Sequence, residues 1–319
     1  MILSILFVII GFAFLIFGAN WLVSGASSLA KKNNISDLVV GLTIVSFGTS
    51  APELVVNSIA SVNGFSDIIL ANIIGSNNFN LFIVLGTAAL VYPITVHYSS
   101  IKREIPLSLF IAILLLGFAN DFWLNETPII SRLDGIILLM LMLAFLLYMF
   151  KQTKTGKIET AEIQYVPTSN LKIWALILLG FAGLVLGGML VVDHSVLIAQ
   201  ELGMSQKIIG LTILAIGTSL PELVTSVVAA TKKNSDIAIG NVIGSNIFNI
   251  LFILAVSSLI HPFNYNTHFN LDLFILIGGT IFLLVAMFIG KRKKIDRWEA
   301  LILVGFYVSY TCYLVWKEM

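Results

Sequence analysis

Apolar runs of membrane-spanning length follow one another along nearly the whole chain, separated by short polar connections. The first run lacks a basic leader and is too long for a signal-peptide core, so it is predicted to be a retained helix. Ten helices are predicted, at 2–30, 37–62, 67–91, 102–119, 132–150, 172–200, 208–231, 236–260, 270–290 and 298–316. The pattern predicts an all-α polytopic membrane protein with ten transmembrane helices.

Composition supports this class. Mean hydropathy is +1.00 and only 11% of residues are charged, whereas about a quarter are charged in soluble domains. A net charge of +1 gives no reason to expect nucleic acid as a partner, and Cys312, the single cysteine, cannot form an internal disulfide. The lipid bilayer is the expected surrounding, the plasma membrane of a prokaryote the default location, and no obligatory protein partner is evident.

Basic residues distinguish the two sides of the predicted membrane. With ten helices, fifteen of the eighteen lysines and arginines fall in the loops after helices 1, 3, 5, 7 and 9, and three (Arg132, Lys207 and Lys317) fall on the other side. Because cytoplasmic loops carry an excess of basic residues, both termini are predicted to be extracellular or periplasmic.

The two halves of the chain repeat. A shift of 169 residues aligns 41–93 with 210–262 without a gap, and 25 of these 53 positions are identical. Equivalent helices are separated by five spans, an odd number, so they should cross the membrane in opposite directions. The sequence thus predicts two inverted five-helix repeats, 1–150 and 172–319, joined by a short cytoplasmic linker at 151–171.

Each repeat carries a carboxylate inside an apolar segment. The strings are Gly-Thr-Ser-Ala-Pro-Glu at 48–53 and Gly-Thr-Ser-Leu-Pro-Glu at 217–222. A charged group at mid-membrane costs roughly 2.5–3.5 kcal/mol on insertion scales, so Glu53 and Glu222 are predicted to be functional. Pro52 and Pro221 each lack an N–H and should break the helix, which frees carbonyls at Ser46–Thr49 and at Ala215–Thr218.

A second polar string lies in the following helix of each repeat. Polar residues at i, i+4 and i+8 form a stripe on one helix face; they are Asn72, Ser76 and Asn80, and Asn241, Ser245 and Asn249. Asn72 and Asn241 either line a site or only bridge helices. Gly75 and Gly244 are predicted to allow close helix packing.

Together these strings offer only oxygen donors. Carboxylates, amides, freed carbonyls and the hydroxyls of Thr49, Ser50, Thr218 and Ser219 suit a hard cation, and about six such oxygens fall within the 6–8 that Ca²⁺ takes. Zinc or copper would favour His or Cys. The same oxygens could hold several Na⁺ ions. No cofactor is expected, since the cations would be transported substrates.

Three other polar features have simpler interpretations. Asp67 and Asp236 are predicted to cap the helices that follow Ser66 and Ser235. Asp193 and His194 have either a gating or proton-sensing role or a paired or water-facing structural one.

The paired strings resemble the repeats of the cation/Ca²⁺ exchanger superfamily, in particular its prokaryotic Na⁺/Ca²⁺ exchanger branch. The resemblance covers essentially the whole chain and implies Na⁺/Ca²⁺ exchange by alternating access, with helices 1 and 6 sliding against a core of helices 2, 3, 7 and 8.

By motif position the resemblance also implies a set of ion ligands. They are the carboxylates of Glu53 and Glu222, carbonyls of Thr49 and Thr218, hydroxyls of Ser50 and Ser219, backbone oxygens of Ser46 and Ala215, and a lining from Ser76, Asn80, Ser245 and Asn249. Some members, including the K⁺-dependent branch, carry Asp where this chain has Asn249, so K⁺ cotransport is not expected.

The sequence therefore predicts a secondary antiporter that exchanges Na⁺ for Ca²⁺ at a shared midplane site. A Ca²⁺/H⁺ antiporter using the same glutamates is the alternative, although its branch typically has a glutamate in the second string. A cation channel would be expected to use oligomeric symmetry around a pore rather than repeats within one chain. No nucleophile–base pair accompanies the glutamates, so an enzyme is not expected.

Overall fold

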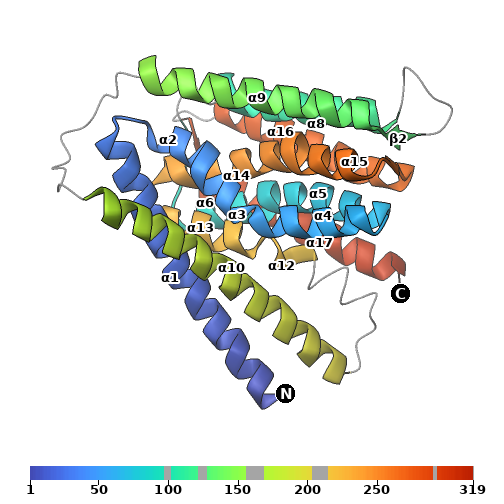
Figure 1. Cartoon of the computed structure of the whole chain (residues 1–319), viewed down its shortest axis with the longest axis horizontal. Coiled ribbons are helices and arrows are strands. Elements are labelled where there is room, and N and C mark those ends of the chain that lie inside the picture. Colours follow the sequence, from blue (N-terminus) through green and yellow to red (C-terminus); the bar gives the residue numbers. More distant parts are fainter. Residues whose placement is uncertain (97–101, 121–127, 156–168, 203–214, 290–292, 319) are drawn as a thin grey trace.

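The computed structural model describes residues 1–96, 102–120, 128–155, 169–202, 215–289 and 293–318 (Figure 1). The helices of the first half are α1 (Ile2–Lys32), α2 (Asp37–Val40), η1 (Gly41–Val45), α3 (Ser46–Thr49), α4 (Ala51–Val62), α5 (Ser66–Phe79), η2 (Asn80–Val84), α6 (Leu85–Val91), α8 (Glu104–Ala119) and α9 (Arg132–Thr155). Those of the second half are α10 (Asn170–Glu201), α12 (Ala215–Gly217), α13 (Leu220–Thr231), α14 (Ser235–Phe248), η4 (Asn249–Leu254), α15 (Ala255–Ile260), η5 (Thr267–Phe269), α16 (Asn270–Ile289) and α17 (Arg297–Glu318).

The prediction of a polytopic helical membrane protein is confirmed. Among the described residues, six helices are long and apolar enough to cross a bilayer, and the bent pair α2–α4 makes a seventh. Two shorter apolar helices, α8 and α13, accompany them. The start of the predicted helix 208–231 lies outside the described residues. Ten spans in two inverted repeats remain a prediction.

Burial separates central from peripheral helices. In an apolar stretch of 18 residues within each of the spans Ser66–Val91 and Ser235–Ile260, 78% is buried inside the protein. The corresponding share is 28% for α1 and 33% for α10. The two central spans contain the asparagine- and serine-rich strings, so the polar stripes face protein rather than lipid. In Figure 1, α8, α9 and α16 lie on one side of this core, and α1 and α10 lie on the other.

Helices α1 and α10 form a close antiparallel pair through glycines. A Cβ at Gly11 would lie 2.9 Å from the carbonyl oxygen of Gly187, and one at Gly18 would lie 2.9 Å from that of Gly180. Small residues let backbones approach in this way in membranes. The 169-residue shift relates Gly11 to Gly180 and Gly18 to Gly187, so the two contacts are repeat-related.

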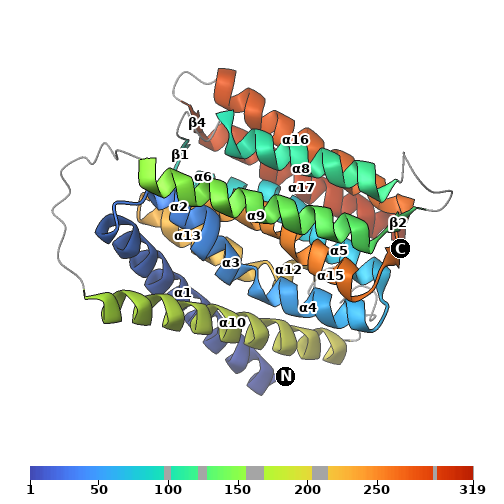
Figure 2. The ribbon, with the colours of Figure 1, turned by 45° about the horizontal axis from the view of Figure 1, so that its top comes forward.

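Two short ribbons join the halves at opposite ends of the helix bundle (Figure 2). Strand β1 (Ile94–Thr95) pairs with β4 (Lys294–Ile295), and β2 (Ile129–Ile130) pairs with β3 (Phe263–Asn264), both antiparallel. Each ribbon therefore contains one strand from each half. The 169-residue shift takes β1 onto β3.

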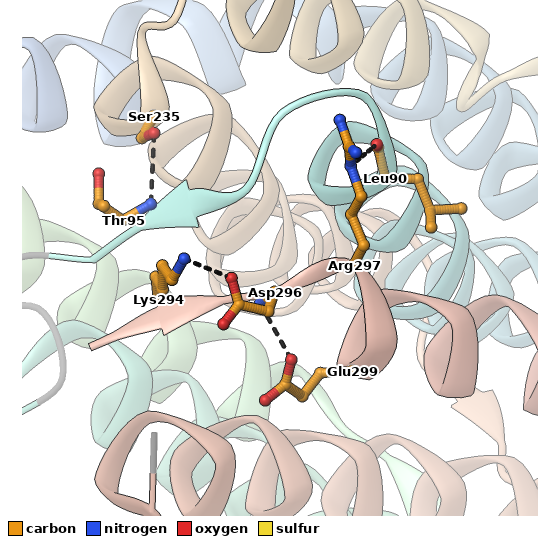
Figure 3. Close-up of polar contacts among 7 residues, drawn as sticks. All are labelled: Leu90, Thr95, Ser235, Lys294, Asp296, Arg297 and Glu299. Atoms are coloured by element: carbon orange, nitrogen blue, oxygen red, sulfur yellow. Dashed lines mark hydrogen bonds and ion pairs between the residues drawn. The ribbon is translucent and has the colours of Figure 1, made fainter. Parts of the chain in front are cut away.

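Side chains fasten the β1–β4 ribbon to the neighbouring helices (Figure 3). Arg297 Nε donates to the carbonyl of Leu90 at 3.1 Å, and the backbone N–H of Thr95 donates to Ser235 Oγ at 3.3 Å. Lys294 and Asp296 form an ion pair at 2.6 Å. At the other ribbon Arg132 Nε donates to the carbonyl of Leu259, the repeat mate of Leu90, at 3.3 Å.

Gly244 packs closely in this structure, whereas Gly75 does not among the described residues. A Cβ at Gly244 would lie 2.6 Å from Ser46 Oγ and 2.8 Å from the carbonyl oxygen of Leu42, which places α14 directly against η1 and α3. At Gly75 no atom of the described residues lies within 4 Å of that position. The expectation of close packing is confirmed at Gly244. For Gly75 it stays a prediction, since Leu211, the repeat mate of Leu42, lies outside the described residues.

Candidate functional site

Both proline-containing strings break their helices. Helices α3 and α4 meet at Ser50 with a bend of 47°, and Pro52 lies in the first turn of α4. In the second half α12 ends at Gly217 and α13 begins at Leu220, with Pro221 in its first turn. A proline without an N–H fits an N-terminal turn, where that donor has no intrahelical acceptor. The break therefore falls where the sequence predicted it.

The breaks place the two carboxylates in one buried network. Glu53 is 1% exposed and Glu222 is 0% exposed. Ser50 Oγ donates to Glu222 Oε1 at 2.8 Å, and Ser219 Oγ donates to Glu53 Oε1 at 3.2 Å. Each carboxylate is thus held by the serine of the other half, and the two are close enough to interact electrostatically.

The central helices add hydroxyls to this network. Ser219 Oγ lies 3.0 Å from Ser76 Oγ on α5, and Ser245 Oγ of α14 donates to Glu222 Oε1 at 3.4 Å. Four helical segments therefore meet at the carboxylates, two from each half of the chain. We call these six residues, Ser50, Glu53, Ser76, Ser219, Glu222 and Ser245, the carboxylate cluster.

Several buried oxygens of the predicted ligands lack a hydrogen-bond partner among the described residues. They include Glu53 Oε2, Glu222 Oε2, Asn80 Oδ1 and Asn249 Oδ1. A buried polar group without a partner is costly, so their accumulation indicates a ligand. These oxygens suit a hard cation.

Asn80 and Asn249 open π-helical turns, η2 and η4. Such turns occur frequently at functional sites. No described hydrogen bond joins either amide to a carboxylate, and Asn249 Nδ2 instead donates to Asn77 Oδ1 at 2.9 Å. The structure buries both residues but does not link them to the carboxylate cluster.

The threonine hydroxyls contact the asparagines of the second strings, and the Thr49 side chain also hydrogen-bonds to Glu222. Thr49 Oγ1 donates to Asn241 Oδ1 at 3.0 Å, and Asn72 Nδ2 donates to Thr218 Oγ1 at 3.2 Å. Asn72 and Asn241 thus bridge helices, one of the two roles left open by the sequence.

The predicted backbone ligands lie at the helix breaks. The carbonyl of Ser46 accepts from the Ser50 N–H at 3.0 Å and from Thr49 Oγ1 at 3.2 Å. Ala215 is the first residue of α12. Pro52 has no N–H to offer the carbonyl of Gly48, so the hydrogen-bond ladder is interrupted beside the cluster.

Sequence reasoning missed two sets of buried polar residues. Asn77 and Asn246 exchange hydrogen bonds, each side-chain Nδ2 donating to the other's carbonyl at 3.3 and 3.2 Å. They are related by the 169-residue shift, so their identity in both repeats could have marked them. Asn57 and Ser226 differ between the repeats and escaped for that reason, although each lies four residues after a glutamate.

The predicted capping role of Asp67 and Asp236 is wrong. The cap of α14 is Asn234, whose side chain accepts from the N–H of Ile237 at 3.0 Å. Phe65 precedes α5 without a side-chain cap. Both aspartates lie in the first turn, where a negative charge interacts favourably with the helix dipole.

His194 stacks on Phe7 with ring centroids 4.5 Å apart, and the neighbouring Asp193 is exposed. This arrangement joins α1 to α10 and agrees with the structural alternative for the two residues. Met1 and Glu201 form an ion pair at 2.9 Å between the same two helices.

A polar contact ties α1 to α13 at the end of α13 that carries Lys232. Lys232 Nζ donates to the carbonyl of Asn20 and to Ser24 Oγ, both at 2.9 Å. Asn234 Nδ2 donates to Ser27 Oγ at 2.8 Å. Partial burial of the ammonium lowers the pKa of Lys232. We call this the Lys232 contact.

Comparison with known proteins agrees with the fold and the motifs. The sodium/calcium exchanger protein family matches residues 3–151 and 172–316. The inner membrane protein YrbG of Escherichia coli is 33% identical over 99% of this chain and 98% of its own length. The sodium/calcium exchanger MaX1 of Methanosarcina acetivorans is 32% identical over 96% of this chain and 97% of its own length.

Solved structures of the sodium-calcium exchanger NCX_Mj superpose on this chain. One, soaked with Na⁺ and Sr²⁺, has a TM-score of 0.83 and 32% identity, with 98% of each chain covered. The protein is therefore a polytopic membrane transporter and not an enzyme. It belongs to the sodium/calcium exchanger family, in its prokaryotic branch.

Proposed function

We propose that this protein exchanges Na⁺ for Ca²⁺ at a single site built on Glu53 and Glu222, in the plasma membrane. The observation that carries the proposal is the carboxylate cluster. Two buried acids from different halves are held by each other's serines, and each keeps one carboxylate oxygen without a partner among the described residues. Two negative charges balance one Ca²⁺, and the same oxygens can take Na⁺ once Ca²⁺ leaves.

The ligand set would centre on the two carboxylates. Around them we place the hydroxyls of Ser50, Ser76, Ser219 and Ser245, the carbonyls of Ser46 and Ala215, both the carbonyls and the hydroxyls of Thr49 and Thr218, and the amides of Asn80 and Asn249. The interrupted ladders at the two breaks direct carbonyls toward this region, as broken helices do in other transporters.

Several contacts support ten spans in two inverted repeats, 1–150 and 172–319. The ribbons pair the loop after helix 3 with the loop after helix 9, and the loop after helix 4 with the loop after helix 8. In a ten-helix topology the members of each pair lie on the same side. The excess of basic residues assigns the β1–β4 end to the cytoplasm and both termini to the outside.

Alternating access would use the α1–α10 pair. Helix α1 packs along α13, whereas α10 makes no comparable contact along α4, its repeat-related partner. The Lys232 contact lies on the packed side, whereas the repeat mate of Lys232, Asn63, donates within its own helix to the carbonyl of Ile59. We infer that this structure is closed on the Lys232 side. In the opposite state α10 would pack along α4, and α1 would separate from α13.

The proposal predicts Ca²⁺ flux driven by Na⁺. In proteoliposomes loaded with Na⁺, ⁴⁵Ca²⁺ uptake should begin when external Na⁺ is removed, and it should stop when the Na⁺ gradient is collapsed. Uptake driven by a pH gradient in the absence of Na⁺, with none under a Na⁺ gradient, would instead establish the Ca²⁺/H⁺ alternative. Downhill Ca²⁺ flux without a counter-ion would establish a channel.

Removing the Lys232 contact is expected to loosen α1. Lys232→Met deletes hydrogen bonds worth about 0.5–1.5 kcal/mol each, so amides in the last turns of α1 should exchange hydrogen about two- to tenfold faster in nanodiscs. Lys172→Met, on the exposed start of α10, is the control and should leave α1 unchanged. Equal rates of amide hydrogen exchange in the two variants would show that the Lys232 contact does not hold α1 against α13.

A further inference from the structure

Two buried asparagines, Asn57 and Asn72, connect the backbone of Glu53 to Thr218 through hydrogen bonds. Asn57 is fully buried, and its Nδ2 donates both to the carbonyl of Glu53 at 2.7 Å and to Asn72 Oδ1 at 2.6 Å. Because Asn72 Oδ1 is occupied in this way, Asn72 presents its Nδ2 to Thr218 Oγ1 at 3.2 Å. The hydroxyl oxygen of Thr218 therefore accepts a hydrogen bond at this point.

In the repeat-related set of residues beside Glu222, the hydrogen bonds run in the opposite donor-to-acceptor direction. Asn241 Nδ2 donates to the carbonyl of Glu222 at 3.2 Å and to Ser226 Oγ at 2.9 Å. Its Oδ1 then faces Thr49, whose hydroxyl donates at 3.0 Å. Asn241 and Ser226 are both fully buried, so these bonds are shielded from bulk solvent.

The difference arises at one pair of repeat mates, Asn57 and Ser226. Asn57 donates one N–H to the backbone carbonyl of Glu53 and the other to Asn72. In the described part of the chain Ser226 makes no such bond to Glu222, and Asn241 of the next helix donates to the Glu222 carbonyl and to the Ser226 hydroxyl instead. Carbonyl oxygens accept only, and amide nitrogens donate only, so each choice determines the orientation of the next amide.

We propose that Asn57 and Ser226 are positioning residues of the cation site. Each acts through the asparagine of the neighbouring helix, and together they make the two threonine hydroxyls unequal. The Thr49 hydroxyl acts as a donor, at 3.0 Å to Asn241 Oδ1 and at 3.2 Å to the carbonyl of Ser46, and keeps its lone pairs. Thr218 instead accepts from the N–H of Asn72 and has given it a lone pair. The inference rests on the proposed function only in that the bound cation lies beside Thr49 and Thr218.

This inequality has a direct consequence for the cation. A hydroxyl with its proton directed elsewhere is an oxygen ligand, while one that accepts from an amide offers less electron density and brings an N–H close to the ion. Ca²⁺ takes 6–8 oxygens, so the loss of one weakens its binding. The Thr49 side of the site should therefore contribute more to Ca²⁺ affinity than the Thr218 side.

The chain supplies its own test, because the two residues can be exchanged. Ser226→Asn introduces an amide that can donate to the carbonyl of Glu222, as Asn57 donates to the carbonyl of Glu53. It should reorient Asn241, turn its N–H toward Thr49 and raise KM for Ca²⁺ about three- to tenfold, the value of about one hydrogen bond, with little change in kcat. Asn57→Ser should shift KM in the opposite direction, and the double exchange should return it close to the wild-type value.

The measurements are initial rates of ⁴⁵Ca²⁺ uptake in proteoliposomes and calorimetric Ca²⁺ titration of the solubilised protein in Na⁺-free buffer. Asn33→Ser, at the exposed C-terminal end of α1, is the control for the substitution type. Single exchanges that raise KM together, or that leave KM and the titrated affinity unchanged in protein that elutes as a single species, would overturn the proposal. The titration needs no Na⁺ coupling, so wild-type protein that binds Ca²⁺ without Na⁺-driven uptake would refute the proposed function alone.

Discussion

Glu53→Gln and Glu222→Gln should each abolish Na⁺-dependent ⁴⁵Ca²⁺ uptake while leaving a folded protein. The amide retains an oxygen that can accept from Ser219 or Ser50, so the hydrogen bonds that hold the side chain persist. It removes one of the two charges that balance Ca²⁺. Truncating one partner of a buried charge pair costs about 2–5 kcal/mol, which corresponds to at least a roughly 30-fold loss at low Ca²⁺.

Glu104→Gln is the matched control for these variants. Glu104 is also buried, at 2% exposure, but it lies on α8, where Tyr148 Oη and Gln152 Nε2 donate to it. This substitution should leave exchange within about twofold of the wild-type rate, since Glu104 lies outside the carboxylate cluster and an amide oxygen can still accept from Tyr148 and Gln152. If a glutamine at 53 or 222 supported uptake comparable to that of the control, the carboxylate cluster would not be the transport site.

Gly244→Ala should have the second largest effect, through the packing of α14 on the first half. A methyl group there would meet Ser46 Oγ at 2.6 Å and the carbonyl oxygen of Leu42 at 2.8 Å. Overpacking of this kind costs about 1–3 kcal/mol, and the adjacent Ser245 would move relative to Glu222. We expect a lower midpoint of thermal unfolding in detergent, together with loss of exchange.

Gly305→Ala is the control for the substitution type. Gly305 is an exposed residue of α17, and no atom of the described residues lies within 4 Å of the added methyl group. Its unfolding midpoint should therefore stay near that of the wild type. An equal decrease in both variants would mean that helix propensity, not the contact with Ser46 and Leu42, explains the effect.

The sequence predicted the helix breaks because their causes are local. Proline lacks an N–H wherever it lies, and a break follows within one turn. The segments of membrane length and the repeat were equally readable, because hydropathy and identity need no knowledge of contacts. Among the capping predictions the local rule failed: Asn234, two residues before the predicted Asp236, provides the cap of α14.

The partners within the site could not be predicted in the same way. Ser50 bonds to Glu222 across 172 positions and Thr49 to Asn241 across 192. Which hydroxyl meets which acid depends on how the central helices rotate against each other. The π-helical turns at Asn80 and Asn249 rotate them further, and no pattern in the sequence indicated these turns.

By itself, the sequence determined that this is a membrane protein of two related halves with an acid buried in each, because hydrophobicity, charge and repetition are properties of residues and their spacing. Only the tertiary structure decided that each acid is held by the other half's serine, that α1 packs along α13 while α10 has no comparable contact along α4 among the described residues, and that Asn57 donates hydrogen bonds where Ser226 accepts one. Those outcomes depend on close packing, where a donor or acceptor already engaged by one neighbour is no longer available to the next.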